Sequence, residues 1–128
     1  MTFSVGDILH INSPIAGKKK YHICLGQNEF VITLCLFLNS KHGYQSDIVF
    51  DCSLFPMIPA SSTGLSVVSL SMMPRYSEAQ LNLYQAERIG VIREDVAGEI
   101  LVACKASSAL TKLEKAFAIR ALESLLSN

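Results

Sequence analysis

The stretch Phe30-Val-Ile-Thr-Leu-Cys-Leu-Phe-Leu38 decides how this chain folds, because it is almost continuously apolar and rich in β-branched and aromatic residues. Such a run is typical of a strand that is buried on both faces of a sheet. A buried helix has the same composition, but turn-forming residues stand on both sides, with Gln27-Asn28 before the run and 39–43 after it. We therefore expect a central strand over 30–38.

Shorter apolar runs around this stretch predict four more strands. Turn residues separate them, including Asn12-Ser13-Pro14, a tight hairpin at Gly26-Gln27-Asn28, and the loop residues 56–64. Pro74 cannot donate a hydrogen bond to a sheet and is expected to end the last strand. The four predicted strands are Asp7–Ile11, Tyr21–Leu25, Asp47–Cys52 and Leu65–Met73.

The last third of the chain predicts helices. Ser77 precedes Gln80 and Thr111 precedes Glu114 by three residues, which is the spacing of a capping box. Helices are therefore expected over Glu78–Tyr84 and from Thr111 to Leu126. Their apolar positions support this, and those of the last helix are Phe117, Ala118, Ala121, Leu122 and Leu125.

Between these two helices, Gly90 is expected to interrupt the helical structure. A further helix is expected from Glu94, with an apolar stripe formed by Val96, Ile100, Ala103 and Cys104. Five strands followed by helices indicate the α+β class and argue against a parallel sheet. The simplest arrangement is a small antiparallel barrel with helices on one side. We expect a single domain over 1–128, with the barrel at about 3–76 and the helical part at about 77–126.

The composition sets limits on the class of protein. With 128 residues the chain is one ordinary domain, and with 50% hydrophobic and 17% charged residues it is not a disordered protein. Because so few charged residues are available to cover the surface, some apolar surface is expected to contact another subunit. We therefore expect a homodimer or a complex. Eleven basic residues balance eleven acidic ones, so any anion site must be local.

Neither a metal nor a cofactor is expected. The three histidines share no metal-ligand spacing, His22 is expected to be half-buried and structural, and the cysteines are spread without a C-x-x-C pair. No phosphate-loop, dinucleotide, zinc-protease or nucleophile-elbow motif occurs. The chain also shows no signal-peptide pattern and no apolar run near the ~18–20 residues of a membrane span, so we expect a cytoplasmic protein without membrane contact.

A run of three lysines, Lys18-Lys19-Lys20, lies between the first two predicted strands. A basic loop of this kind is either a solvated turn or a contact for phosphate or another anion. Asn39 and Ser40 follow the central strand, where scaffolds commonly mount functional residues, although a turn role explains them as well. His42 lies in the same polar loop and is a candidate to reach a substrate.

Arg75 follows a long apolar run and is the only arginine in the first 87 residues. At a strand end, a guanidinium group can present five donors to a phosphate or a carboxylate. The alternative is a structural ion pair with Asp47, Asp51 or Glu78.

Taken in order, several segments resemble the MazF/PemK/Kid family of toxins from bacterial toxin–antitoxin systems. The resemblance covers roughly residues 3 to 104 and depends on order and spacing. The segments that carry it are Val5-Gly6-Asp7-Ile8-Leu9, Gly17 to Lys20 leading into Tyr21–Leu25, Leu36-Phe37-Leu38-Asn39-Ser40, Gly64 to Ser77 with Arg75-Tyr76-Ser77, and Arg88-Ile89-Gly90.

This resemblance implies an SH3-like barrel with C-terminal helices, a homodimer, an antitoxin partner and metal-independent cleavage of single-stranded RNA. In that reaction the ribose 2′-hydroxyl attacks the adjacent phosphorus, so the enzyme needs a base, an acid and donors for the developing negative charge. Arg75 would stabilise the transition state, Lys20 would hold the phosphate, and Ser40 would position it. The implied site residues are Arg75, Ser40 and His42 for catalysis and Lys20, Lys19 and Asn39 for substrate binding.

The chain departs from the family pattern at three places. Lys20-Tyr21 stands where the family has Arg-Pro, Ser77 stands where some members have Asp, and the last helix extends beyond the usual end. A second interpretation is therefore a non-catalytic binding protein on the same barrel, as in the gyrase-poisoning relatives of this fold. A third is a regulatory module whose long C-terminal helix docks a partner.

Overall fold

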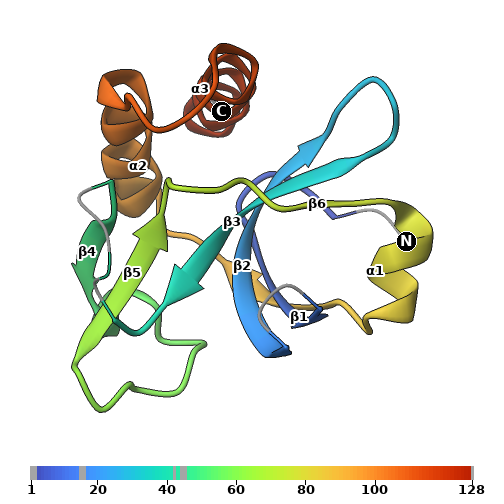
Figure 1. The fold of residues 1–128 in the computed structure, drawn as a ribbon. Coiled ribbons are helices and arrows are strands. Elements are labelled where there is room, and N and C mark those ends of the chain that lie inside the picture. Colours follow the sequence, from blue (N-terminus) through green and yellow to red (C-terminus); the bar gives the residue numbers. More distant parts are fainter. Residues whose placement is uncertain (1–2, 15–16, 42, 44–45, 128) are drawn as a thin grey trace.

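The fold is α+β, with an antiparallel sheet of seven strands and C-terminal helices over the residues that the structure describes (Figure 1). The structure is a computed structural model, and it describes residues 3–14, 17–41, 43 and 46–127. The strands are β1 (Asp7–Ser13), β2 (Lys18–Gln27), β3 (Thr33–Asn39), β4 (Ile48–Asp51), β5 (Leu65–Ser69), β6 (Arg75–Tyr76) and β7 (Glu87–Val91). The helices are α1 (Glu78–Leu83), α2 (Glu94–Ala106) and α3 (Lys112–Leu126), and a 3-10 turn, η1, spans Cys52–Leu54.

The sheet is an open path with the strand order β4-β5-β3-β2-β1-β7. β6 lies off this path and pairs with β3. All neighbouring strands are antiparallel, as expected for a chain in which strands do not alternate with helices.

The predicted central strand is confirmed. β3 pairs with β2 on one side and with β5 and β6 on the other, and 33–38 are all buried. The strand begins at Thr33 and not at Phe30, because the Asn28 side chain accepts hydrogen bonds from the amides of Phe30 (2.9 Å) and Ile32 (3.1 Å) and holds 28–32 in a turn. Phe30 and Val31 therefore point into solvent.

The predicted strand over 65–73 is wrong beyond Ser69. β5 pairs with the end of β3, where Phe37 faces Ser69, and β6 pairs with its beginning, where Leu34 faces Arg75. One straight strand cannot make both pairings, so the chain bends between β5 and β6. Met73 is buried in this bend, whereas Met72 is exposed.

The break predicted at Gly90 is also wrong, because Gly90 lies within β7. β7 pairs with β1, with Gly90 opposite Ile8. A side chain at Gly90 would not fit, since a Cβ there would lie 3.0 Å from the Cγ of Met57. The absence of a side chain at Gly90 therefore allows Met57 to pack closely against β7.

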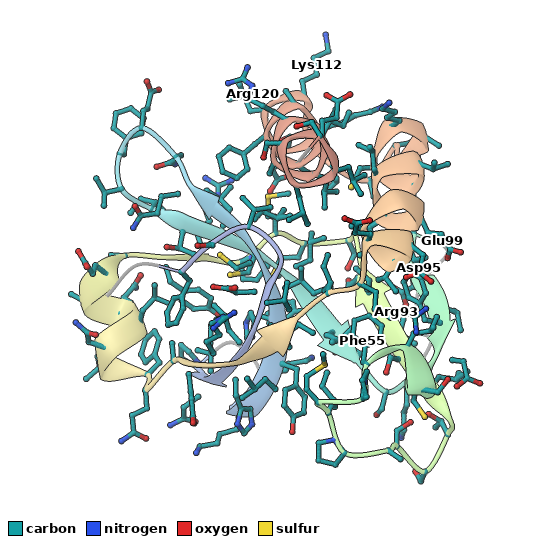
Figure 2. All side chains as sticks on the ribbon, turned by 180° about the vertical axis from the view of Figure 1, so that it is seen from behind. Phe55, Arg93, Asp95, Glu99, Lys112 and Arg120 are labelled. Carbon is teal, nitrogen blue, oxygen red and sulfur yellow. The ribbon has the colours of Figure 1, made fainter. Side chains whose placement is uncertain are left out.

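Helices α2 and α3 cover one face of the sheet (Figure 1; Figure 2 shows the same helices from behind). The predicted apolar positions of both helices are confirmed, since Ile100, Cys104 and Leu122 are fully buried against the sheet. Both predicted capping boxes are present. Ser77 and Gln80 cap the N-terminus of α1, and Thr111 and Glu114 cap the N-terminus of α3.

A smaller core lies on the other face of the sheet. Leu81 of α1 packs there with Tyr76 and with Leu9 of β1. The expectation that all helices lie on one side is therefore wrong, because side chains alternate along each strand and both faces of the central strands are apolar. Within the described part of the chain, no helix has the length and apolar character needed to cross a bilayer.

Candidate functional site

One cavity brings together four of the six residues that the sequence singled out. It has a volume of about 520 Å³, and Lys19, Lys20, Asn39 and Ser40 line it. Residues of the 52–64 segment and the start of β5 complete the wall. The further lining residues are Tyr21, Leu38, Lys41, Ile58, Pro59, Ser61, Leu65 and Ser66.

Strand pairing explains why these residues meet. Tyr21 of β2 lies opposite Leu38 of β3, so the basic start of β2 runs beside the end of β3. Asn39 in turn lies opposite Val67 of β5. Residues that are about twenty positions apart in the sequence therefore meet at one end of the central strands β2 and β3.

The loop after η1 closes the cavity from the third side. The Thr63 hydroxyl donates a hydrogen bond to the carbonyl oxygen of Ser40, which ties this loop to the end of β3. The Ser61 hydroxyl donates to the carbonyl oxygen of Leu65 (2.8 Å) and accepts from its amide (3.1 Å). The turn at 61–64 is thus held in place by its own side chains, with Gly64 at a positive φ of 73°.

The charges around the cavity have one sign. Lys19, Lys20 and Lys41 line it, and no carboxylate is found among the described lining residues. The Nζ of Lys20 lies 4.8 Å from the centre of the Phe37 ring, where the negative face of the ring stabilises the ammonium, and Phe37 is not among the residues that line the cavity. Hydroxyl and amide groups stand beside these cations, so the cavity suits a polar anion such as a phosphate.

Arg75 lies apart from this cavity. It pairs with Leu34, five residues before Asn39 in β3, which is a separation of roughly 17 Å at the usual strand rise. Its side chain is 60% exposed, and its Nη2 lies 3.5 Å from a carboxylate oxygen of Glu114 at the start of α3. The alternative of a structural ion pair is therefore present, but its partner is Glu114 and not one of the expected Asp47, Asp51 or Glu78.

Two further expectations concern histidines. His42 lies outside the described residues. His22 is fully buried and not half-buried, and its Nε2 lies 2.9 Å from the hydroxyl of Tyr76. Burial lowers the pKa of His22 to about 4, so its ring is neutral at pH 7.

The tautomer of His22 follows from its two neighbours. Its Nδ1 lies 3.1 Å from the carbonyl oxygen of Lys20, which can only accept, so Nδ1 carries the proton. Nε2 then accepts a hydrogen bond from the Tyr76 hydroxyl. His22 is a structural residue that joins β2 to β6.

Three lining residues were not expected at a site from the sequence, namely Lys41, Tyr21 and Ser61. Lys41 stands next to Ser40 in the loop already singled out, so its charge was a usable signal. Ser61 was seen only as part of a turn cluster, because its approach to β3 depends on the path of the 52–64 segment. Within the described residues, no cluster of His, Cys, Asp or Glu is arranged to hold a metal ion.

No family model matches the chain, and no curated protein matches it.

Proposed function

We propose that the cavity lined by Lys19, Lys20 and Lys41 binds the phosphodiester backbone of single-stranded RNA, and that the protein is a MazF/PemK-like endoribonuclease that needs no metal. The observation that supports this most is the single sign of charge around an open cavity in a chain of zero net charge. Phosphate contacts by lysines supply most of the affinity of proteins for nucleic acids.

The same cavity supports the family resemblance. Its segments Lys20-Tyr21 and Asn39-Ser40 were matched separately to the family, and they form neighbouring walls. Two segments that resemble one family and also share a cavity favour a common role in binding the substrate. We extend the resemblance to the fold and propose that the open sheet is a variant of the SH3-like barrel.

The proposed reaction is attack of a ribose 2′-hydroxyl on the adjacent phosphorus, which releases a 5′-hydroxyl and leaves a 2′,3′-cyclic phosphate. Lys19, Lys20 and Lys41 would neutralise the phosphate, and Asn39 and Ser40 would donate hydrogen bonds that position it. A proton acceptor is also needed, and His42, which follows Lys41 in the chain, is the proposed acid or base. Arg75 is assigned no role in this proposal, because it lies outside the cavity lining.

The test is incubation of the purified protein with an RNA of mixed sequence in EDTA, followed by mapping of the new ends. We expect cyclic phosphate and 5′-hydroxyl ends, and Lys19→Ala combined with Lys41→Ala should lower cleavage by ~10²-fold or more, the scale of losing preorganised charge at the phosphate. Lys112→Ala is the matched control, since Lys112 is an exposed lysine on α3 away from the cavity.

The second candidate function is a non-catalytic binding protein that uses the same cavity. The departures from the family pattern favour it, above all Lys20 where the family has Arg, because a lysine does not give the two parallel hydrogen bonds of a guanidinium. RNA binding without cleavage would support this candidate. If the wild type and the double lysine variant bind RNA equally and neither cuts it, the proposed site is wrong.

We also propose the assembly that the resemblance implies, which is a cytoplasmic homodimer inhibited by an antitoxin protein. The low share of charged residues supports a partner, as do large apolar side chains that are exposed in the single chain, such as Val102 and Leu113. The four cysteines are free thiols, which fits a reducing compartment.

A further inference from the structure

Cys24 of β2 and Cys35 of β3 lie directly opposite each other in the sheet. Both side chains point into the smaller core and are fully buried. This pair plays no part in the cavity described above, and neither cysteine lines it.

The backbone hydrogen bonds around the two cysteines define the kind of pair they form. The amide of Cys35 donates to the carbonyl oxygen of Pro74 (3.0 Å), which lies on the β6 side of β3. The carbonyl oxygen of Cys24 accepts from the amide of Gly6 (2.9 Å), which lies on the β1 side of β2. Both residues thus direct their backbone groups away from each other, so they form a non-hydrogen-bonded pair.

This geometry is the one that accepts a disulfide across two strands. In a non-hydrogen-bonded antiparallel pair the Cα atoms lie about 4.5 Å apart and the side chains are at their closest. Disulfides in proteins span Cα separations of about 4.4–6.8 Å. A bond between Cys24 and Cys35 therefore requires a change of side-chain torsions and no movement of the strands.

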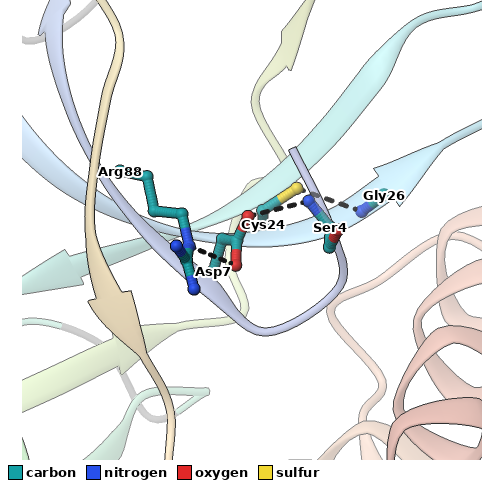
Figure 3. Close-up of polar contacts among 5 residues, drawn as sticks. All are labelled: Ser4, Asp7, Cys24, Gly26 and Arg88. Atoms are coloured by element: carbon teal, nitrogen blue, oxygen red, sulfur yellow. Dashed lines mark hydrogen bonds and ion pairs between the residues drawn. The ribbon is translucent and has the colours of Figure 1, made fainter. Parts of the chain in front are cut away.

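The surroundings of the two sulfur atoms make them chemically unequal. Cys35 donates a hydrogen bond to the Sγ of Cys24, which lowers the pKa of Cys24 and raises that of Cys35. The amide of Gly26 also donates to the Sγ of Cys24 (3.3 Å; Figure 3). The nearby Asp7 carboxylate, which raises the pKa of Cys24, is itself bound by the Arg88 Nε (3.0 Å) and by the Ser4 amide (2.8 Å).

We propose that Cys24 and Cys35 are a redox-modification site that closes a cross-strand disulfide when a low-molecular-weight disulfide is in excess. Because both sulfur atoms are fully buried, the exchange proceeds through local opening of the smaller core. In the opened state the Cys24 thiolate attacks one sulfur of oxidised glutathione, whose S–S bond breaks, and one glutathione leaves as a thiolate that takes up a proton. Cys35 then loses its proton and attacks the Sγ of Cys24, which expels the second glutathione. The cysteines lose two electrons, and the glutathione disulfide is reduced to two thiols.

The other two cysteines serve as internal controls. Cys104 is fully buried in the other core, and burial raises its pKa to about 11. Cys52 is half-buried at η1. Neither faces another cysteine among the strand pairs of the sheet, so neither is expected to react within the chain.

The experiment equilibrates the full chain in buffers with increasing ratios of oxidised to reduced glutathione, starting once from folded reduced protein and once from protein refolded in the same buffer. After an acid quench, free thiols are alkylated in denaturant, and the bonds are assigned by peptide mass spectrometry. We expect both starting points to reach the same level of a Cys24–Cys35 bond while Cys52 and Cys104 are alkylated. The oxidised protein should melt about 5–10 °C higher, since the bond closes a short loop without strain.

Variants refine the assignment. Cys104→Ala should leave formation of the bond unchanged, and Cys24→Ala should abolish it without creating a different one. The proposal fails if refolded protein keeps both thiols at every ratio, if only the refolded sample is oxidised, or if the bond lowers the melting temperature. Mapping to any other pair of cysteines also overturns it.

Discussion

Arg75 illustrates how one side chain can fit two opposed roles until its neighbours are known. A guanidinium group at a strand end suits a phosphate as well as a carboxylate. In the structure it meets Glu114, whose carboxylate also accepts a hydrogen bond from the Thr111 amide (3.0 Å) as part of the capping box of α3. Arg75 thus links β6 to the first turn of α3.

We predict that Arg75→Ala lowers the free energy of unfolding by no more than about 1 kcal/mol, since the pair is largely exposed on the arginine side. Cleavage per folded molecule should be unchanged. Glu114→Gln is the matched variant, because glutamine keeps the capping box and removes the ion pair. Melting curves and RNA cleavage are measured on the same preparations, and a ~10²-fold loss of cleavage in Arg75→Ala alone would restore its role at the transition state.

His22 makes the stability of the fold depend on pH. Burial lowers its pKa from 6.5 to about 4, so between these values the unfolded chain binds a proton there and the folded protein does not. The free energy of unfolding must therefore fall as the pH is lowered through this range, by up to about 3 kcal/mol in total.

The measurement is urea unfolding at pH 7, 6, 5 and 4. His22→Leu should be less stable at pH 7, because it leaves the Tyr76 hydroxyl without this partner, and its stability should change much less with pH. An equal slope in the variant and the wild type would show that other groups cause the pH dependence.

Among the elements, α3 shows how a helix at the end of a chain becomes part of the core. Ala118 and Leu122 are fully buried, and the helix lies against α2 and β2. A helix of this length is only marginally stable alone in water, so its order depends on this contact.

We predict that truncation after Ser108 exposes the apolar surface of α2 and the sheet, and that the shortened protein melts at a lower temperature or aggregates. Thermal unfolding and solubility are compared with those of the full chain. Thr111→Ala provides a milder test, since loss of one cap costs about 1 kcal/mol while the buried face is kept. Unchanged melting of the truncated protein would contradict the packing of α3.

β7 is the element that local sequence could not reveal. Glu87-Arg88-Ile89-Gly90-Val91 has no alternation of apolar and polar residues and contains a glycine, both of which argue against a strand. Its strand conformation comes from pairing with β1, and this pairing is a contact between residues about eighty positions apart. No short segment of the sequence contains both partners of this pairing, so its local pattern cannot predict the strand.

For the whole molecule, the balance of charge and apolar surface leads to a prediction about assembly. With 17% charged residues and large apolar side chains in solvent, we predict a stable homodimer that buries the usual ~1,600 Å² or more. Sedimentation velocity at micromolar concentration is the measurement. A single species of about 14 kDa would contradict the prediction.

Local patterns in the sequence were enough to predict the α+β class, the central strand, the capping boxes of α1 and α3 and the buried faces of α2 and α3. These features depend on neighbours within a few residues, through apolar periodicity and side-chain hydrogen bonds to the backbone. Tertiary structure decided the strand order, the bend between β5 and β6, the partner of Arg75 and the meeting of Lys19, Ser40 and Ser61 at one cavity. The physical reason is that strand pairing joins distant segments, so the position of a strand end depends on the whole sheet and not on its own residues.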